Sequence, residues 1–397
     1  MVAQPYVSDP EKTGLILDAI HDRLEANKKA FTAIGVRYGT TGLCLYHFAR
    51  ALYLDRPEDA ERGAAVLEHT FELLNAGYVS ERLFHEMAEI GWAIETLKAA
   101  GIYDIDTNEV LNDFDELLLP RLEEAMEAGN FDPAIGAVSF GNYFVARMRS
   151  NPDLEPVVAR LCDQLVHHSH LAPEGRYWKS KLMNDDSVYI GLSHGIAGLN
   201  LFLIHAGKAL GRDYRKLVSE SCRFIVHSEL KGEPVFFPVV HGKSNDAPIY
   251  ANNWCYGDPG TLYGLMACAK YTGDEELEKF AQHRLRSCAF RERNETYLVA
   301  GYALLYGYAG LAMLYDNLAS MTGQEFLNEA KRMIIERITG AFDPTDAYLG
   351  FRGYWNQEAA VTNYSFSEGM AGIAMLLMAE TRPEIRQLYH PFYFIWP

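Results

Sequence analysis

A pair of glycines with two residues between them recurs along this 397-residue chain and constrains its fold more than any other feature. One copy, Gly257 and Gly260, follows Cys255 by two residues. An apolar run follows each intact copy, and the copies begin at Gly39, Gly195, Gly257, Gly307 and Gly369. Self-similarity at a regular period is the signature of a repeat architecture, so the repeat decides the fold class.

Two further copies are altered. Glu86-Met-Ala-Glu89 stands where the second pair is expected, and Gly136-Ala-Val-Ser139 keeps only one glycine of the third. Successive starts lie from about 47 to about 62 residues apart, which is enough for two helices and their loops. No alternation of apolar and polar residues is long enough to indicate a sheet. We therefore predict an all-α fold, an α/α toroid of seven helical hairpins with about fourteen helices, as one domain over residues 1–397 with no inserted second domain.

The glycines themselves have a structural explanation, because small residues at the start of a helix let neighbouring backbones approach closely. In a toroid the glycine-started helices form the inner ring, and the loops before them crowd one end of the central cavity. We call the two residues before each repeat start the entry pairs: Arg37–Tyr38, Phe84–His85, Ala134–Ile135, Ser193–His194, Cys255–Tyr256, Leu305–Tyr306 and Ser367–Glu368. A purely structural set would be mostly aliphatic, so these pairs are where we look for chemistry.

Composition narrows the partners and the compartment. The net charge is -17 with interspersed charges, which makes a nucleic-acid backbone an unfavourable partner. The six cysteines show no CxxC spacing, and Cys44, Cys222 and Cys268 lie in apolar runs typical of core thiols. The first residues lack the basic and apolar regions of a secretory signal, and no apolar stretch approaches the ~20 residues of a membrane helix. We expect a cytoplasmic protein without a transmembrane segment.

Two segments, Gly191-Leu-Ser-His-Gly-Ile-Ala-Gly198 and Trp254-Cys-Tyr-Gly257, set among repeats that cover nearly the whole chain, resemble the lanthionine synthetase C-like (LanC-like) family. The resemblance implies an α/α toroid. It also implies a cyclase that adds cysteine thiols of a precursor peptide across that peptide's dehydrated serines and threonines, forming thioether rings. The implied partners are the precursor peptide, with its leader and dehydrated core, and a lanthipeptide dehydratase.

The resemblance implies a zinc ion that activates the thiol, and Cys255 matches its first ligand. The other two ligand positions fall on Leu305 and Tyr306. Leucine has no lone pair and a neutral tyrosine is a poor ligand, so we predict an incomplete zinc site. The family also tends to have an arginine at the position of Ala251. A rearranged site would have to recruit histidines such as His85, His194 and His241.

The same resemblance assigns His194 as the residue that moves a proton and Asp132 as an aspartate of the pocket. The long aromatic loops before the repeat starts fit a cleft that holds an extended chain. We expect substrate contacts from Trp254, Tyr256, Tyr306 and His85.

Three functions stay open on the sequence alone. The first is a cyclase that relies on His194 and Asp132, because a histidine base can replace part of what a metal supplies. The second is a catalytically lapsed protein that binds the peptide for a dehydratase. The third is a carbohydrate-active toroid that uses two of the carboxylates Asp132, Asp258 and Glu368, placed roughly 5–9.5 Å apart. Structural roles are open too: Cys255 as a buried thiol, His194 in a core hydrogen bond, and Asp132 and Asp258 as helix caps.

Overall fold

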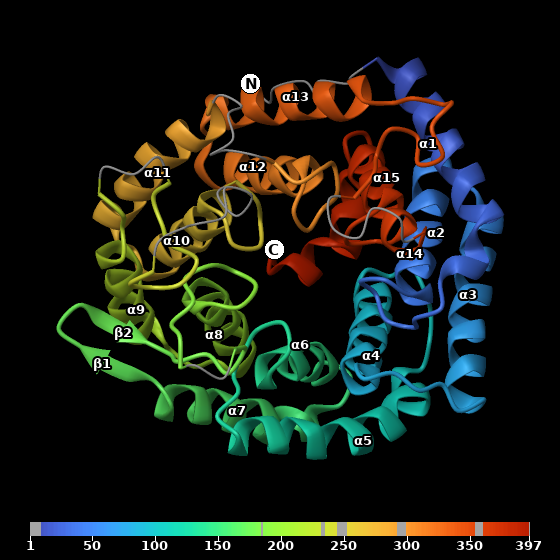
Figure 1. Ribbon diagram of the computed structural model, residues 1–397. Helices are drawn as coiled ribbons and strands as arrows, with labels where there is room; N and C mark the ends of the chain where they lie inside the picture. The colour runs from blue at the N-terminus through green and yellow to red at the C-terminus, as the bar shows by residue number, and fades with distance from the viewer. Residues whose placement is uncertain are drawn as a thin grey trace. The chain divides into compact units, whose positions relative to one another are not determined.

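The computed structural model describes residues 9–183, 186–231, 235–243, 252–291, 299–353 and 360–396, which are predominantly helical (Figure 1). The chain packs as two compact units. Unit 1 runs to Ile105 and resumes from Val299 to Ile395, and unit 2 holds the residues between, together with Trp396. The predicted all-α class is confirmed. That the chain is one domain stays a prediction.

Unit 1 is built from helix pairs in which α2 packs on α3, α12 on α13, and α15 on α1. The chain's first helix is thus the partner of its last glycine-started helix. The bounds are α1 Pro10–Ala26, α2 Thr40–Leu54, α3 Pro57–Asn75, α4 Leu83–Ala99, α12 Tyr308–Thr322, α13 Glu325–Gly340, α14 Ala360–Tyr364 and α15 Met370–Ala379.

In unit 2, α5 and α7 pack on α6, α8 on α9, and α10 on α11. Glycine-started helices such as α8 are apolar nearly all round and buried, whereas partners such as α9 bury one stripe only. The bounds are α5 Thr107–Glu127, α6 Ala137–Arg147, α7 Glu155–His167, β1 His170–Ala172, β2 Gly175–Tyr177, α8 Ile196–Leu210, α9 Arg215–His227, α10 Asp258–Thr272 and α11 Glu275–Ala289.

The glycine pairs have the role expected of them. The first glycine is the N-cap of α2, α6, α8, α10, α12 and α15. A Cβ on the second would lie 2.0 Å from the Leu192 carbonyl oxygen at Gly198 and 2.1 Å from that of Trp254 at Gly260. At these two positions only glycine lets the preceding loop lie directly on the helix's first turn.

One small sheet departs from the helical expectation. Strands β1 and β2 form an antiparallel hairpin in which His170 pairs with Tyr177. Gly175 starts the second strand at φ +139°, and a Cβ there would meet the Glu220 carbonyl oxygen of α9 at 2.4 Å. A turn this short between three-residue strands leaves no alternating pattern long enough to predict.

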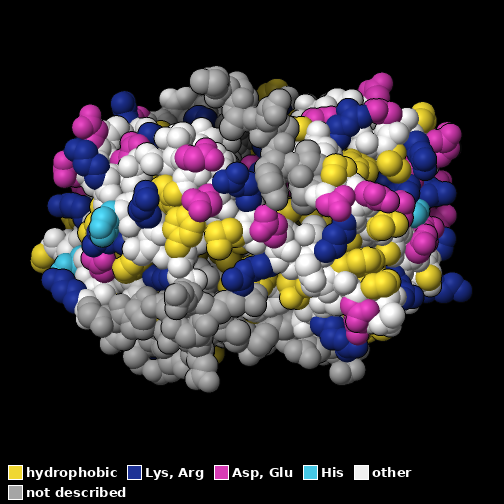
Figure 2. Space-filling view, turned by 90° about the horizontal axis from the view of Figure 1, so that it is seen from above, with side chains coloured by type: hydrophobic (Ala, Val, Ile, Leu, Met, Phe, Trp, Pro, Cys, Tyr) yellow, Lys and Arg dark blue, Asp and Glu magenta, His cyan; other side chains and the backbone are white. Residues whose placement is uncertain are grey.

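The aromatic end of the chain, through Ile395, packs within unit 1. Two 3₁₀ helices, η5 (Pro383–Leu388) and η6 (His390–Tyr393), bury Leu388, Tyr389 and Tyr393. Figure 2 shows one face on which acidic and basic side chains are interspersed with hydrophobic ones. Among the described helices, none is both long and apolar enough to cross a membrane.

Candidate functional site

The entry pairs are held by a turn that several repeats share. The amide that follows the first glycine donates to the carbonyl seven residues earlier, so the loop curls back over the start of the helix. This bond measures 2.8 to 3.2 Å and joins Thr40 to Ala33, Ala137 to Asn130, Ile196 to Tyr189 and Tyr308 to Gly301. The recurring glycines therefore fix the backbone from which the entry side chains extend.

Main-chain hydrogen bonds also join entry pairs of successive repeats. In unit 2 the Ser193 amide donates to the Cys255 carbonyl at 3.3 Å. In unit 1 the Leu305 amide donates to the Ser367 carbonyl at 2.9 Å, and the Ser367 amide to the Arg37 carbonyl at 3.1 Å. Positions more than 50 residues apart in sequence thus become neighbours, which no local pattern reveals.

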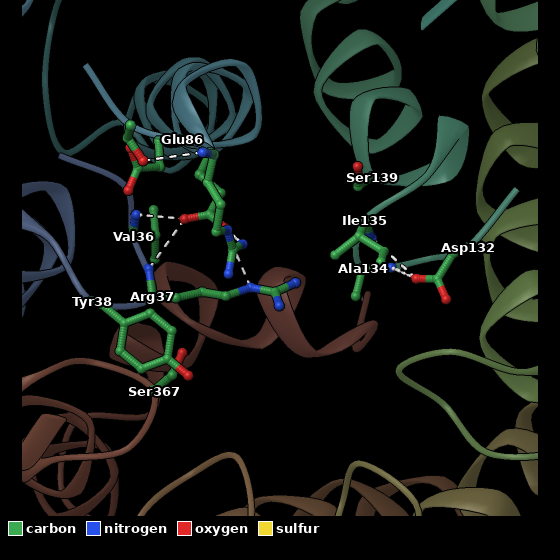
Figure 3. Close-up of polar contacts among 12 residues, drawn as sticks. Val36, Arg37, Tyr38, Glu86, Asp132, Ala134, Ile135, Ser139 and Ser367 are labelled. Carbon is green, nitrogen blue, oxygen red and sulfur yellow. Dashed lines mark hydrogen bonds and ion pairs between the residues drawn. The ribbon is translucent and has the colours of Figure 1, made fainter. Parts of the chain in front are cut away.

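Unit 2 contains an acid–base pair formed by His194 and Asp132. His194 Nδ1 lies 2.9 Å from Asp132 Oδ2 and 3.1 Å from Oδ1. A carboxylate can only accept, so Nδ1 carries the hydrogen and the neutral ring keeps Nε2 as its acceptor. Asp132 Oδ1 also accepts from the amides of Ala134 at 2.8 Å and Ile135 at 3.0 Å (Figure 3).

Burial makes this pair well defined. The Asp132 side chain is 0% exposed and the His194 side chain 14%, so the ring alone reaches solvent or a substrate. The ring of Tyr256 stacks on His194 with 5.5 Å between centroids and 21° between planes. One carboxylate, that of Asp132, can therefore both cap the helix entry and orient the His194 ring for the proposed proton transfer.

Cys255 lies beside this pair. Its Sγ is 2.7 Å from the Ser193 hydroxyl oxygen, and the residue is 1% exposed. The Asn253 side chain shapes the motif, since its Oδ1 accepts from the amides of Tyr256 at 2.8 Å and Gly257 at 3.3 Å. The sequence indicated Cys255 and His194, but the contributions of Ser193 and Asn253 come only from the tertiary structure.

The residues present do not fit the zinc ion that the resemblance implies. Cys255 supplies one thiol, which already contacts Ser193, while Leu305 offers no donor atom. Within the described ranges, no group of three or more His, Cys, Asp or Glu side chains could hold a metal. His241 contacts the Ser228 hydroxyl through Nδ1 at 2.9 Å. Ala251, where the family tends to have arginine, lies outside the described residues.

Unit 1 has a different set of charged residues at its entry pairs (Figure 3). Tyr38 Oη donates to the Glu368 carboxylate. Burial raises the pKa of Glu368, and burial beside that carboxyl raises the pKa of Tyr38. Glu89 accepts from the amides of Val36 at 2.8 Å and Arg37 at 3.2 Å. The acidic residue that replaces a glycine in the second repeat thus braces the entry turn of the first.

The predicted substrate contacts differ in exposure. Trp254 is only 3% exposed, so its ring serves packing more than contact with a ligand. Tyr256, Tyr306 and His85 are half-buried. Tyr256 belongs to unit 2 with His194, whereas Tyr306 and His85 belong to unit 1. These roles stay predictions.

Asp258 has a structural role. Its carboxylate accepts from the amides of Phe236 and Phe237, both at 2.9 Å, and pairs with Arg291 Nη2 at 2.7 Å. It is 0% exposed. Burial raises its pKa, against the opposing effect of Arg291. A carboxylate this enclosed cannot contact a sugar, so the carbohydrate alternative gains no support here.

Comparisons with known proteins identify the family and the fold. The model of the family described as lanthionine synthetase C-like protein matches residues 32–395. Part of the chain is 25% identical over 170 residues to the Danio rerio protein named glutathione S-transferase LANCL1, covering 42% of this chain and 40% of that protein. The chain thus matches well under half the length of that relative. The structure matches a nisin cyclase with a TM-score of 0.73 and 14% identity, over 95% of this chain and 97% of the other. This match confirms the predicted α/α toroid fold class.

Proposed function

The chain belongs to the lanthionine synthetase C-like protein family, and from that premise we propose that it forms carbon–sulfur bonds by adding a thiol to a dehydrated serine or threonine of a precursor peptide. The observation that carries the proposal is the His194–Asp132 pair, with the carboxylate buried and the ring partly exposed. The names of two similar proteins, a cyclase and a glutathione S-transferase, point to related chemistry.

The pair can supply both proton transfers of such an addition. Nε2 of His194 accepts the proton as the S–H bond breaks, and the thiolate sulfur attacks the β-carbon of the dehydrated residue. The α-carbon then takes the proton back from Nε2, so that one C–S and one C–H bond replace the S–H bond and the C=C double bond. Asp132 holds the ring in one tautomer and stabilises its charged form.

A general base matters here because the donor set does not fit zinc. A thiol near its free pKa of ~8.5 is only a few per cent ionised at pH 7. Histidine can take the proton in that range, and general acid–base catalysis contributes typically ~10²–10⁴-fold. This chain's chemistry would then depend on positioning and on His194.

A second function has its own supporting observation. Leu305 keeps the entry-pair backbone, with its amide on the Ser367 carbonyl, while presenting a side chain that cannot bind a metal. That combination favours a protein that retains the peptide-holding framework without turnover. It would then bind the precursor peptide and act as a partner of a dehydratase.

The test follows ring formation on a dehydrated precursor peptide. Cyclisation leaves the mass unchanged, so remaining thiols are counted by alkylation and mass spectrometry. We expect His194→Asn to lower the rate by about 10²–10⁴-fold while peptide binding is retained. His283→Asn, at an exposed histidine of unit 2, is the matched control and should match the wild type.

Each result separates the two functions. Equal rates for His194→Asn and the wild type would rule out the proton-transfer role. Tight peptide binding with no turnover in the wild type would favour the partner protein. Metal content is measured alongside by plasma mass spectrometry, with Cys255→Ala. About one zinc per chain, lost in that variant, would overturn the metal-independent mechanism.

A further inference from the structure

A cleft of about 240 Å³ opens in unit 2, and one of its lining residues is adjacent in sequence to Asp132. Phe131, which lines the cleft, immediately precedes Asp132. The other lining residues come from the ends of α5 and α7, the hairpin and the segment that follows it, and include Glu127, His168, Trp178, Lys179, Lys181 and Asp186. This volume is below the ~300–1,000 Å³ of typical small-molecule pockets, which favours a single side chain as occupant.

The aromatic lining of the cleft is rigid. Trp178 is 4% and Phe131 5% exposed. The indole Nε1 of Trp178 donates to the Leu165 carbonyl at 2.7 Å, which fixes its ring. The His168 ring packs on Phe131 with 5.0 Å between centroids. Such a lining suits the methylene groups of a bound side chain and reduces the mobility lost when a ligand binds.

Two lysines and two carboxylates, those of Glu127 and Asp186, line the cleft, and the chain itself shows what the lysines can hold. Lys179 Nζ lies 3.2 Å and Lys181 Nζ 2.9 Å from the two carboxylate oxygens of Asp186. Hydrogen bonds from the two lysines lower the pKa of Asp186. The lysine side chains are 42% and 41% exposed, and that of Asp186 is 51% exposed. Two accessible ammonium groups share one carboxylate, so a second carboxylate can bind without either lysine losing a partner.

We propose that this cleft binds an acidic side chain, aspartate or glutamate, of the peptide on which the protein acts. The inference names a substrate feature and therefore rests on the proposed function. The net charge of -17 repels a polyanion as a whole. Recognition of an isolated acidic residue must then come from individual ammonium groups such as those of Lys179 and Lys181. An acidic residue held here would keep its near neighbours close to the Phe131–Asp132 segment.

The experiment measures binding directly, apart from turnover. The probe is a fluorescein-labelled hexapeptide with one aspartate next to a leucine, and the comparison peptide carries asparagine in its place. We expect the full-length protein to bind the aspartate peptide about fivefold more tightly, the upper end of what a solvent-exposed ion pair contributes. The double variant Lys179→Ala/Lys181→Ala should remove that preference.

A matched control comes from the same unit. Lys270 is 42% exposed and paired with Glu278, and Lys279 is 65% exposed. Lys270→Ala/Lys279→Ala removes the same charge elsewhere and should leave the preference for aspartate intact. Equal loss in both double variants would show a general charge effect and overturn the proposal. So would equal affinity of the wild type for the two peptides.

Failure of this inference differs from failure of the proposed function. His194→Asn should abolish ring formation and leave hexapeptide binding unchanged. Lys179→Ala/Lys181→Ala should raise KM for a precursor with an acidic residue about fivefold with kcat unchanged. Preferential binding of the aspartate peptide without any turnover would support the cleft proposal and contradict the cyclase function. Turnover with no preference for aspartate would contradict the cleft proposal alone.

Discussion

Two carboxyls near repeat starts, Asp132 in unit 2 and Glu368 in unit 1, differ in what they can do. In unit 2 the Asp132 carboxylate is fixed by two backbone amides and faces His194. In unit 1 the Glu368 carboxyl faces Tyr38, and burial raises the pKa of both partners. A histidine exchanges protons near neutral pH, whereas a buried tyrosine does not. The residue that faces each carboxyl therefore decides whether a proton can be exchanged near neutral pH.

The largest expected effect tests this contrast through the reaction rate. Asp132→Asn keeps an oxygen for the backbone amides but cannot stabilise the charged histidine. We expect a loss of about 100-fold or more in ring formation. Glu368→Gln should leave the rate unchanged, because no step of the proposed reaction uses that carboxyl. The measurement is thiol consumption on the same peptide. Similar losses in both variants would end the distinction between the units.

A smaller effect tests whether the turn before the glycine-started helices depends on the second glycine in both units. Gly198→Ala would put a Cβ 2.0 Å from the Leu192 carbonyl oxygen, and Gly372→Ala would do the same at the Phe366 carbonyl. We expect each to lower the free energy of unfolding by at least ~1–3 kcal/mol, as overpacking does. Thermal unfolding measures it.

Gly14→Ala is the control for the glycine variants, because nothing lies within 4 Å of a Cβ there. An alanine at that position of α1 should be neutral or slightly stabilising. If Gly198→Ala and Gly372→Ala behaved like this control, close backbone approach would not explain the repeated glycines.

The smallest effect concerns stability against pH. Burial raises the pKa of Glu368 above its ordinary value of 4.5. Below that value both folded and unfolded chains keep the proton, so nothing is lost. As pH rises, the unfolded chain releases its proton first, and the folded state loses stability until its own raised pKa is passed. Glu368→Gln should reduce this decline, as followed by chemical denaturation between pH 4 and 7. An unchanged pH profile would contradict the burial of an acidic proton there.

Much of the candidate site was accessible from sequence because it follows the glycines. The spacing located the entry pairs. The resemblance selected His194 and Cys255 among them, and Asp132 two residues before the pair Ala134–Ile135. Neither could supply the partners of those residues. Ser193 touches Cys255, and Glu89 braces Arg37, across 62 and 52 residues of chain. Long-range pairs depend on how neighbouring repeats pack, and one sequence carries no direct record of that packing.

By itself the sequence determined the all-α class and the positions of the glycine-started helices, and it predicted an incomplete set of zinc ligands. These follow from local causes, since glycine tolerates close backbone approach and leucine has no donor atom. The tertiary structure alone decided that α1 pairs with α15, that Asp258 is buried against Arg291, and that two lysines share Asp186 at a cleft. Each of these depends on which side chains distant repeats bring together, and burial then sets what each group can do.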